Sequence, residues 1–302
     1  MYKNEYLSFD ENTNLCVYLW LPETEDVKGV IQLAHGMAEH LGRYDEFGEY
    51  FKKLGYIVFG ADHYAHGKSV KDIKDIGVVI DYDFIDAVHQ SIHKTHEKYF
   101  KDLDVPHYLF SHSMGSMAAQ SYIEKYPHDF SKVVLCGTDA PSVLYKMAKM
   151  LTKKRGRIGH IEYWSFAENL GVGSFNKKFK KENDPVAWLS KDLDNRRRYK
   201  EDELCGASFP TNYYYSLASS LVESKKKENR ELINKDLKLL VICGALDPVG
   251  HFGKGPTKLN KQYQKMGLDS SLIIYDDARH EILNEGFIKD KVYSDLLSFF
   301  SK

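Results

Sequence analysis

The sequence predicts an α/β fold in which a mostly parallel central sheet has helices on both faces and an inserted helical cap. Three observations support this fold class. Short apolar runs alternate with helical stretches, the alternation is lost between residues 138 and 212, and it then resumes. Strands separated by helices form parallel neighbours with right-handed crossovers, which cover both faces of the sheet. We expect residues 1–137 and 213–302 to form one core, with residues 138–212 as a cap (lid) that is not an independent domain.

The first elements along the chain form an antiparallel hairpin. Apolar and polar residues alternate from Leu15 to Leu21, and the polar run DENTN separates this strand from an earlier one. The pattern then changes to a strand over GVIQLA (29–34), followed by an aromatic helix around Phe47. Gly55 follows that helix, and we expect it to cap the helix C-terminus.

The remaining core elements follow the same rhythm on either side of the cap. Before it, we expect strands at 56–61, 107–110 and 132–137 and helices at 81–99 and 114–126. The cap is rich in lysine, arginine, asparagine and aromatic residues and contains no convincing strand. After it, we expect strands at 237–244 and 270–276 and helices at 254–266 and 287–300.

Composition excludes several classes of protein. The chain has 302 residues, of which 43% are hydrophobic, which is enough for a sizeable core. Lys plus Arg is 42 and Asp plus Glu is 43, so a dedicated nucleic-acid binder is not expected. The sequence lacks an apolar signal core and a run of roughly 18 apolar residues, which predicts a cytoplasmic protein. Four cysteines without a CxxC pair predict neither disulfides nor structural zinc.

The pentad Ser111-His112-Ser113-Met114-Gly115 places a serine between a predicted strand and a predicted helix. A sharp turn at this position exposes the Ser113 hydroxyl, and it requires small residues two positions away on each side. Glycine is usual at the first of these positions, and Ser111 preserves the small size. Ser113 is therefore the candidate nucleophile, and the alternative is an ordinary serine N-cap.

A serine nucleophile needs a histidine base and a carboxylate that orients the histidine. Asp247 follows the strand LKLLVICG in the loop GALDPVG, and His280 follows the last strand in the loop DARHEILNE. Both come after the serine, each in a loop behind a late strand, where this chemistry requires them. The alternatives are an Asp-Pro turn for Asp247 and a surface or helix-start histidine for His280.

The loop after strand 29–34 contains His35, Gly36 and Met37, and its glycine lets the backbone approach the serine. We expect the backbone N–H groups of Met37 and Met114 to stabilise an oxyanion. His35 and a nearby histidine have no third ligand at a familiar spacing, so no metal site is expected there. Other polar residues after strand 56–61 are interpreted as a network that braces the loop: Asp62, His63, His66 and Gly67.

Taken together, these residues resemble the α/β-hydrolases of the monoacylglycerol lipase and lysophospholipase group, also grouped with serine aminopeptidase-like hydrolases. The resemblance covers essentially the whole chain and rests on six ordered blocks: HGMAEH, ADHYAHGKS, SHSMGS, NDPVAWLSKD, GALDPVG and ARHEILNE. It implies hydrolysis of carboxylic esters through an acyl-enzyme, with Ser113 as nucleophile, His280 as general base and acid, and Asp247 as its partner. It implies no cofactor, and it implies that the cap covers an acyl-binding tunnel.

One cap segment has apolar residues at helical spacing and lysines on its other faces. The apolar residues are Val143, Leu144, Met147, Met150 and Leu151, and the lysines are Lys146, Lys149, Lys153 and Lys154. One interpretation is a lipid-facing lid, with transient membrane contact aided by further basic pairs and triplets at Lys177-Lys178 and Arg196-Arg197-Arg198. The simpler interpretation, favoured because the stripe is short, is a helix whose apolar face packs on the core.

The expected function is a serine esterase for medium or long acyl esters such as monoacylglycerols or lysophospholipids. One alternative is an aminopeptidase-like hydrolase, which would need a carboxylate such as Glu162, Glu182 or Asp184 to hold a substrate ammonium group. Another is a hydrolase fold that binds a ligand without turning it over. Dehalogenase and epoxide hydrolase chemistry place an aspartate at the position of Ser113, which argues against both.

Overall fold

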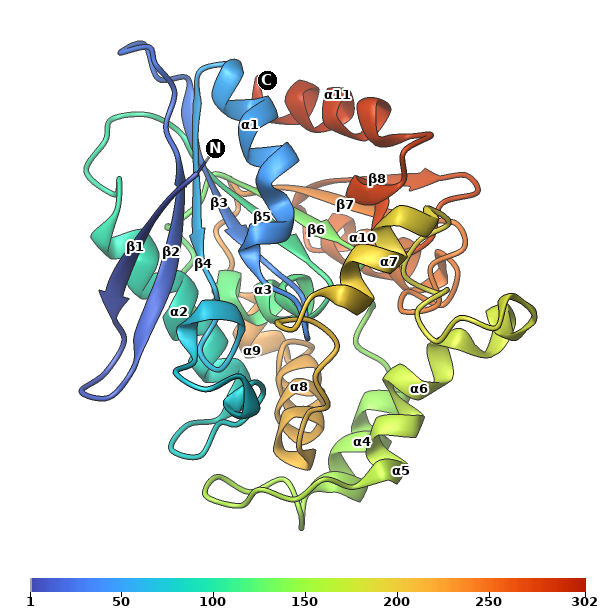
Figure 1. The fold of residues 1–302 in the computed structure, drawn as a ribbon. Coiled ribbons are helices and arrows are strands. Elements are labelled where there is room, and N and C mark those ends of the chain that lie inside the picture. Colours follow the sequence, from blue (N-terminus) through green and yellow to red (C-terminus); the bar gives the residue numbers. More distant parts are fainter. Residues whose placement is uncertain (1) are drawn as a thin grey trace.

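The computed structural model describes residues 2–302, with residue 170 described by its backbone alone. Its centre is an eight-stranded sheet with the order β1-β2-β4-β3-β5-β6-β7-β8 (Figure 1). β1 and β2 form the expected antiparallel hairpin, β2 also pairs antiparallel with β4, and the strands from β3 to β8 pair in parallel. The strands are β1 (Lys3–Ser8), β2 (Asn14–Trp20), β3 (Gly29–Ala34), β4 (Tyr56–Ala61), β5 (His107–His112), β6 (Lys132–Cys136), β7 (Lys238–Gly244) and β8 (Asp269–Tyr275).

Helices cover both faces of the sheet, as the alternation predicts (Figure 1). One face packs against α1 (Asp45–Lys53) and α11 (Lys289–Phe300), whose Phe47 and Phe300 are fully buried there. The other face packs against α2 (Phe84–Lys98), α3 (Met114–Lys125) and α10 (Lys254–Lys265). The fold class is therefore confirmed.

In the described chain between β6 and β7, all regular secondary structure is helical. α4, α5 and α6 lie to one side of α8, at the lower right of Figure 1, and α8 packs against α2, α3 and α4. α8 begins at Thr211, so the expected boundary at residue 213 falls within its first turn. The helices are α4 (Val143–Thr152), α5 (Ser165–Leu170), α6 (Val172–Phe175), the 3-10 helix η4 (Asn176–Glu182), α7 (Leu193–Glu201), α8 (Thr211–Glu223) and α9 (Lys227–Arg230).

The apolar stripe of α4 is exposed, and the interpretation that it packs on the core is wrong. Val143 and Met150 are 69% and 70% exposed, and Leu144, Met147 and Leu151 are also exposed. α4 contacts α8 through its other side, where Thr152 is buried. Among residues 2–302, no helix has the length and apolar character needed to cross a bilayer.

Candidate active site

Ser113 lies in a strained turn between β5 and α3. Its backbone has φ 51° and ψ −119°, a conformation that non-glycine residues rarely adopt. A Cβ atom on Gly115 would lie 2.5 Å from the carbonyl oxygens of Ala34 and His35, so only glycine fits there. At the other flanking position, the Ser111 hydroxyl is buried and donates to the Val134 carbonyl (2.7 Å). The turn therefore has the geometry of a nucleophile elbow.

The structure brings Ser113, His280 and Asp247 into one hydrogen-bonded chain. The Ser113 hydroxyl lies 2.9 Å from Nε2 of His280, and Nδ1 of His280 lies 3.0 Å from Oδ1 of Asp247. Asp247 follows β7 and is fully buried, and its Oδ1 also accepts the N–H of Val249. Because the carboxyl ends of parallel strands meet at one edge of the sheet, three distant loops converge at this position.

The loop after β3 approaches the serine closely. A Cβ atom on Gly36 would lie 3.0 Å from Cβ of Ser113. Met37 and Met114 line the same cavity as Ser113, and Met114 is the first residue of α3, where N–H groups have no intrahelical acceptor. This arrangement places the expected oxyanion donors beside Ser113.

Three buried histidines, one in the loop after β3 and two after β4, support the conformation of the loop after β3. His35 donates through Nδ1 to the Gly36 carbonyl (2.8 Å) and accepts the backbone N–H of His63 at Nε2 (2.9 Å). The His63 and His66 rings contact the His35 ring at 4.2 and 5.2 Å. Desolvation lowers the pKa of all three, to about 3 for His63 and about 4 for His66, so they are neutral at pH 7. Their contacts agree with the interpretation that this region braces the loop.

A cavity of about 810 Å³ opens above Ser113. Its walls include Leu144, Met147 and Leu151 of α4. Trp188, from the segment between β6 and β7, packs on the His280 ring with a centroid distance of 5.1 Å. A mostly apolar cavity of this size accommodates an extended apolar ligand.

Comparison with protein families matches residues 25–286 to the serine aminopeptidase S33 family (Hydrolase_4). The match covers most of the chain, including all of the residues that converge at Ser113. The chain belongs to this family.

Several relatives of this S33 family member are named as lipases. It is 33% identical over 147 residues to the monoacylglycerol lipase of Mycolicibacterium smegmatis, covering 45% of this chain and 48% of the relative. It is 34% identical over 121 residues to the monoglyceride lipase of Rattus norvegicus, covering 40% of this chain and 37% of the relative. The chain thus spans less than half of the length of these curated relatives.

Solved structures show the same α/β-hydrolase fold. The thermostable carboxyl esterase from Bacillus coagulans aligns with a TM-score of 0.82 at 23% identity, covering 99% of this chain and 97% of that one. The soluble variant of the monoglyceride lipase from Saccharomyces cerevisiae aligns with a TM-score of 0.75 at 17% identity, covering 99% and 94%. Monoglyceride lipases and carboxyl esterases are hydrolases, and at these identities the similarity shows the fold.

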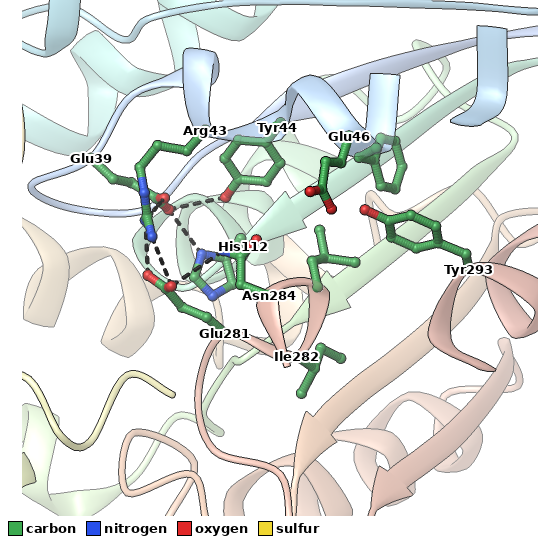
Figure 2. A pocket seen from close by; sticks show the side chains of 11 residues that line it. Glu39, Arg43, Tyr44, Glu46, His112, Glu281, Ile282, Asn284 and Tyr293 are labelled. Carbon is green, nitrogen blue, oxygen red and sulfur yellow. Dashed lines mark hydrogen bonds and ion pairs between the residues drawn. The ribbon is translucent and has the colours of Figure 1, made fainter. Parts of the chain in front are cut away.

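A buried ionic network that the sequence did not indicate connects three loops beside Ser113 (Figure 2). Glu39 accepts the N–H of Gly36 (2.6 Å) and pairs with Nδ1 of His112 (2.9 Å). Arg43 contacts Glu39 (2.7 Å) and makes two hydrogen bonds of 2.8 Å to Glu281. His112 precedes Ser113 and Glu281 follows His280, so adjacency to the candidate residues was the available signal.

Mutual pairing fixes the charges in this network. Burial raises the pKa of Glu39, but His112 and Arg43 hold it well below its usual range. Burial also raises the pKa of Glu281, which Arg43 more than offsets. Desolvation lowers the pKa of His112, yet the hydrogen bond and charge of Glu39 raise it above its ordinary value. The network therefore connects the loop after β3, the turn at Ser113 and the loop that carries His280 through charge-assisted bonds.

The carboxylates considered for binding an ammonium group are already paired with cations. None of the three lines the cavity above Ser113, where the acidic residues are Glu39, Glu168 and Glu281. The pairs are Glu162 with Arg155 and His160, Glu182 with Arg279 and Arg196, and Asp184 with Arg196 and Lys200.

Proposed function

We propose that this chain is a serine hydrolase that cleaves medium or long acyl esters, such as monoacylglycerols or lysophospholipids, through an acyl-enzyme. The observation that carries the proposal is the 2.9 Å contact between the Ser113 hydroxyl and Nε2 of His280 at the floor of an apolar cavity. The names of the lipase relatives support the substrate class. The paired state of Glu162, Glu182 and Asp184 favours esters over aminopeptidase substrates.

In the proposed mechanism, Ser113 attacks the ester carbonyl while its proton passes to Nε2 of His280. The N–H groups of Met37 and Met114 stabilise the oxyanion, and Asp247 stabilises the imidazolium that forms. His280 then gives the proton to the alcohol leaving group as the C–O bond breaks. Water, activated by His280, attacks the acyl-enzyme and releases the carboxylic acid and Ser113.

The test is hydrolysis across a panel of acyl chain lengths, using aryl esters, monoacylglycerols, lysophospholipids and aminoacyl-arylamides. Ser113→Ala should lower turnover by about 10³-fold or more while the protein stays folded. Ser121→Ala, which changes a serine within α3 that does not line the cavity, is the matched control and should retain activity. Near-normal rates in Ser113→Ala would refute the assignment. Faster cleavage of arylamides than of esters would favour the peptidase, and silence on every substrate would favour a binding protein.

We also propose that α4 contacts lipid surfaces transiently. Its apolar side chains are exposed, with Val143 and Met150 at 69% and 70%, and they are flanked by exposed lysines such as Lys146 and Lys153. Binding should be salt-sensitive, because cations attract anionic headgroups. Co-sedimentation with anionic and neutral vesicles at low and high salt tests this, and equal recovery under all conditions would contradict it.

A further inference from the structure

A second cluster of titratable side chains lies at the opposite end of the sheet from Ser113. It joins the end of α2, the loop between α3 and β6, and His107, the first residue of β5. Ser113 follows the last residue of the same strand. This second cluster is therefore separate from the candidate active site, and the mechanism proposed above does not use it.

The sequence of α2 presents three possible ligands on one side of the helix. His93, His96 and Glu97 have the spacing i, i+3 and i+4, which places His96 and Glu97 each beside His93 on the helix surface. Asp129 faces them from the loop before β6, with its Oδ2 3.0 Å from Nδ1 of His93. Ligand atoms of His93, Glu97 and Asp129 all lie within 4.8 Å of one another.

The hydrogen bonds around His96 determine which of its nitrogens carries the proton. The Leu103 carbonyl can only accept, so Nε2 of His107, 3.3 Å away, carries a proton. Nδ1 of neutral His107 is then an acceptor, and it receives the Nε2 proton of His96 at 3.3 Å. Nδ1 of His96 is left with a bare lone pair.

That lone pair is buried and faces a carboxylate. His96 is 4% exposed, and its Nδ1 has no hydrogen-bond partner among the described residues. It lies 3.9 Å from Oδ2 of Asp129. Two electron-rich atoms that face each other in a buried position are stabilised by a cation between them.

We propose that His93, His96, Glu97 and Asp129 bind one divalent transition-metal ion, with Zn²⁺ as the reference ion. Two imidazoles and two carboxylates are a donor set that Zn²⁺ accepts, and the two negative charges match the charge of the ion. Donors in a tetrahedral zinc site lie about 3.4 Å apart, as follows from bond lengths of about 2.0–2.1 Å. The distances of 3.0 and 3.9 Å from Asp129 Oδ2 to the two imidazoles lie on either side of that value.

Binding requires the ligand side chains to rearrange. The proton of His93 moves from Nδ1 to Nε2, and Glu97 exchanges its exposed partner Lys101 for the ion. The hydroxyl of Tyr122 already donates to Oδ2 of Asp129 and would orient this carboxylate, as outer contacts of metal ligands do. The ion would tie the end of α2 to the loop before β6, so it should stabilise the fold and leave ester turnover unchanged.

The test uses the whole 302-residue chain, stripped of metals with a chelator. Zn²⁺ is titrated in competition with a chromophoric chelator, and Co²⁺ binding is followed by its visible absorption. We expect one ion per chain with a dissociation constant of about 1 µM or below, together with a higher melting temperature. His96→Gln and Asp129→Asn should weaken binding at least tenfold and abolish the Co²⁺ spectrum. Since both substitutions put the fold at risk, Glu97→Gln removes a ligand whose side chain is 38% exposed.

Two matched controls should retain binding. His128→Gln removes an exposed histidine adjacent to Asp129. Cys205→Ser disrupts another group of possible ligands, formed by His40, Asp202 and Cys205. The proposal is overturned if the wild-type protein binds neither ion, if the folded Glu97→Gln variant binds as tightly as the wild type, or if Cys205→Ser abolishes binding.

Discussion

Replacing Arg43 with methionine should destabilise the protein strongly, and the size of the effect follows from its contacts. Arg43 is the cation between Glu39 and Glu281, and the side chains of the three residues are 11%, 5% and 4% exposed. Methionine preserves much of the apolar stem but leaves two buried carboxylates without this cation. Breaking a buried ion pair typically costs about 3–5 kcal/mol, a large part of the roughly 5–15 kcal/mol that stabilises a typical domain.

The cost should depend on pH in a defined direction. Without Arg43, desolvation dominates and raises the folded-state pKa of Glu281 above its unfolded value. A carboxyl group with a raised folded-state pKa takes up a proton on folding, so the variant is least affected below the unfolded pKa and loses stability as the pH rises. The difference in unfolding free energy between wild type and variant should therefore be small near pH 4 and largest at pH 7–8.

Urea denaturation between pH 4 and pH 8 measures this difference. Adding Glu281→Gln to Arg43→Met should recover much of the loss, because the unpaired charge is gone. Arg197→Met is the control, since this arginine pairs with Asp194 and Glu201 on the surface, where the effect should fall within experimental error. A loss below about 1 kcal/mol at pH 7, or one that is constant across the pH range, would refute the assigned role of the network.

Three further changes test other parts of the structure. Gly115→Ala forces its Cβ within 2.5 Å of the carbonyl oxygens of Ala34 and His35, and should cost about 1–3 kcal/mol in urea denaturation and reduce labelling by a fluorophosphonate probe. Because the folded-state pKa of His66 is about 4, the protein should lose stability as the pH falls from about 6.5 to 4. His66→Phe should reduce the slope of unfolding free energy against pH by up to about 1.4 kcal/mol per pH unit. An unchanged slope would contradict this prediction. Met147→Asp should lower kcat/KM for long acyl esters about tenfold and change kcat/KM for short aryl esters less than about twofold. An equal loss on both substrates would contradict the proposal that Met147 contacts the acyl chain.

Sequence periodicity predicted the fold well because each core element carries its own signal. The strands from β3 to β7 are largely apolar runs that are buried on both faces, whereas β8 is a partly exposed edge strand. Helices with caps or breakers separate most of these strands. Gly55, at φ +88°, follows α1 as its sequence position predicts. Helix boundaries moved by a few residues, as in α2, which begins at Phe84 and not near residue 81.

The candidate triad could be predicted because chain order and strand ends constrain it strongly. The ionic network could not, because Glu39, Arg43 and Glu281 belong to loops whose relative positions depend on tertiary packing. Arg43 and Glu281 are separated by 238 positions in the sequence, and no periodic signal links them. The proposed metal ligands could not be predicted for the same reason. The HxxHE spacing in α2 indicates a metal site only when the position of Asp129 and the protonated nitrogen of His107 are known from the structure.

The exposed stripe of α4 shows a different limit of periodicity. Apolar residues at helical spacing specify that a helix has an apolar face, but they do not specify what covers that face. Leu144 and Met147 are 59% and 53% exposed and also line the cavity above Ser113, so one helix is both cavity wall and outer surface. Exposed apolar area is unfavourable by about 25 cal/mol per Å², and contact with an acyl chain or a lipid surface would remove that cost. Substrate entry and surface contact are therefore expected to depend on the same side chains, and a substitution such as Met147→Asp should affect both together.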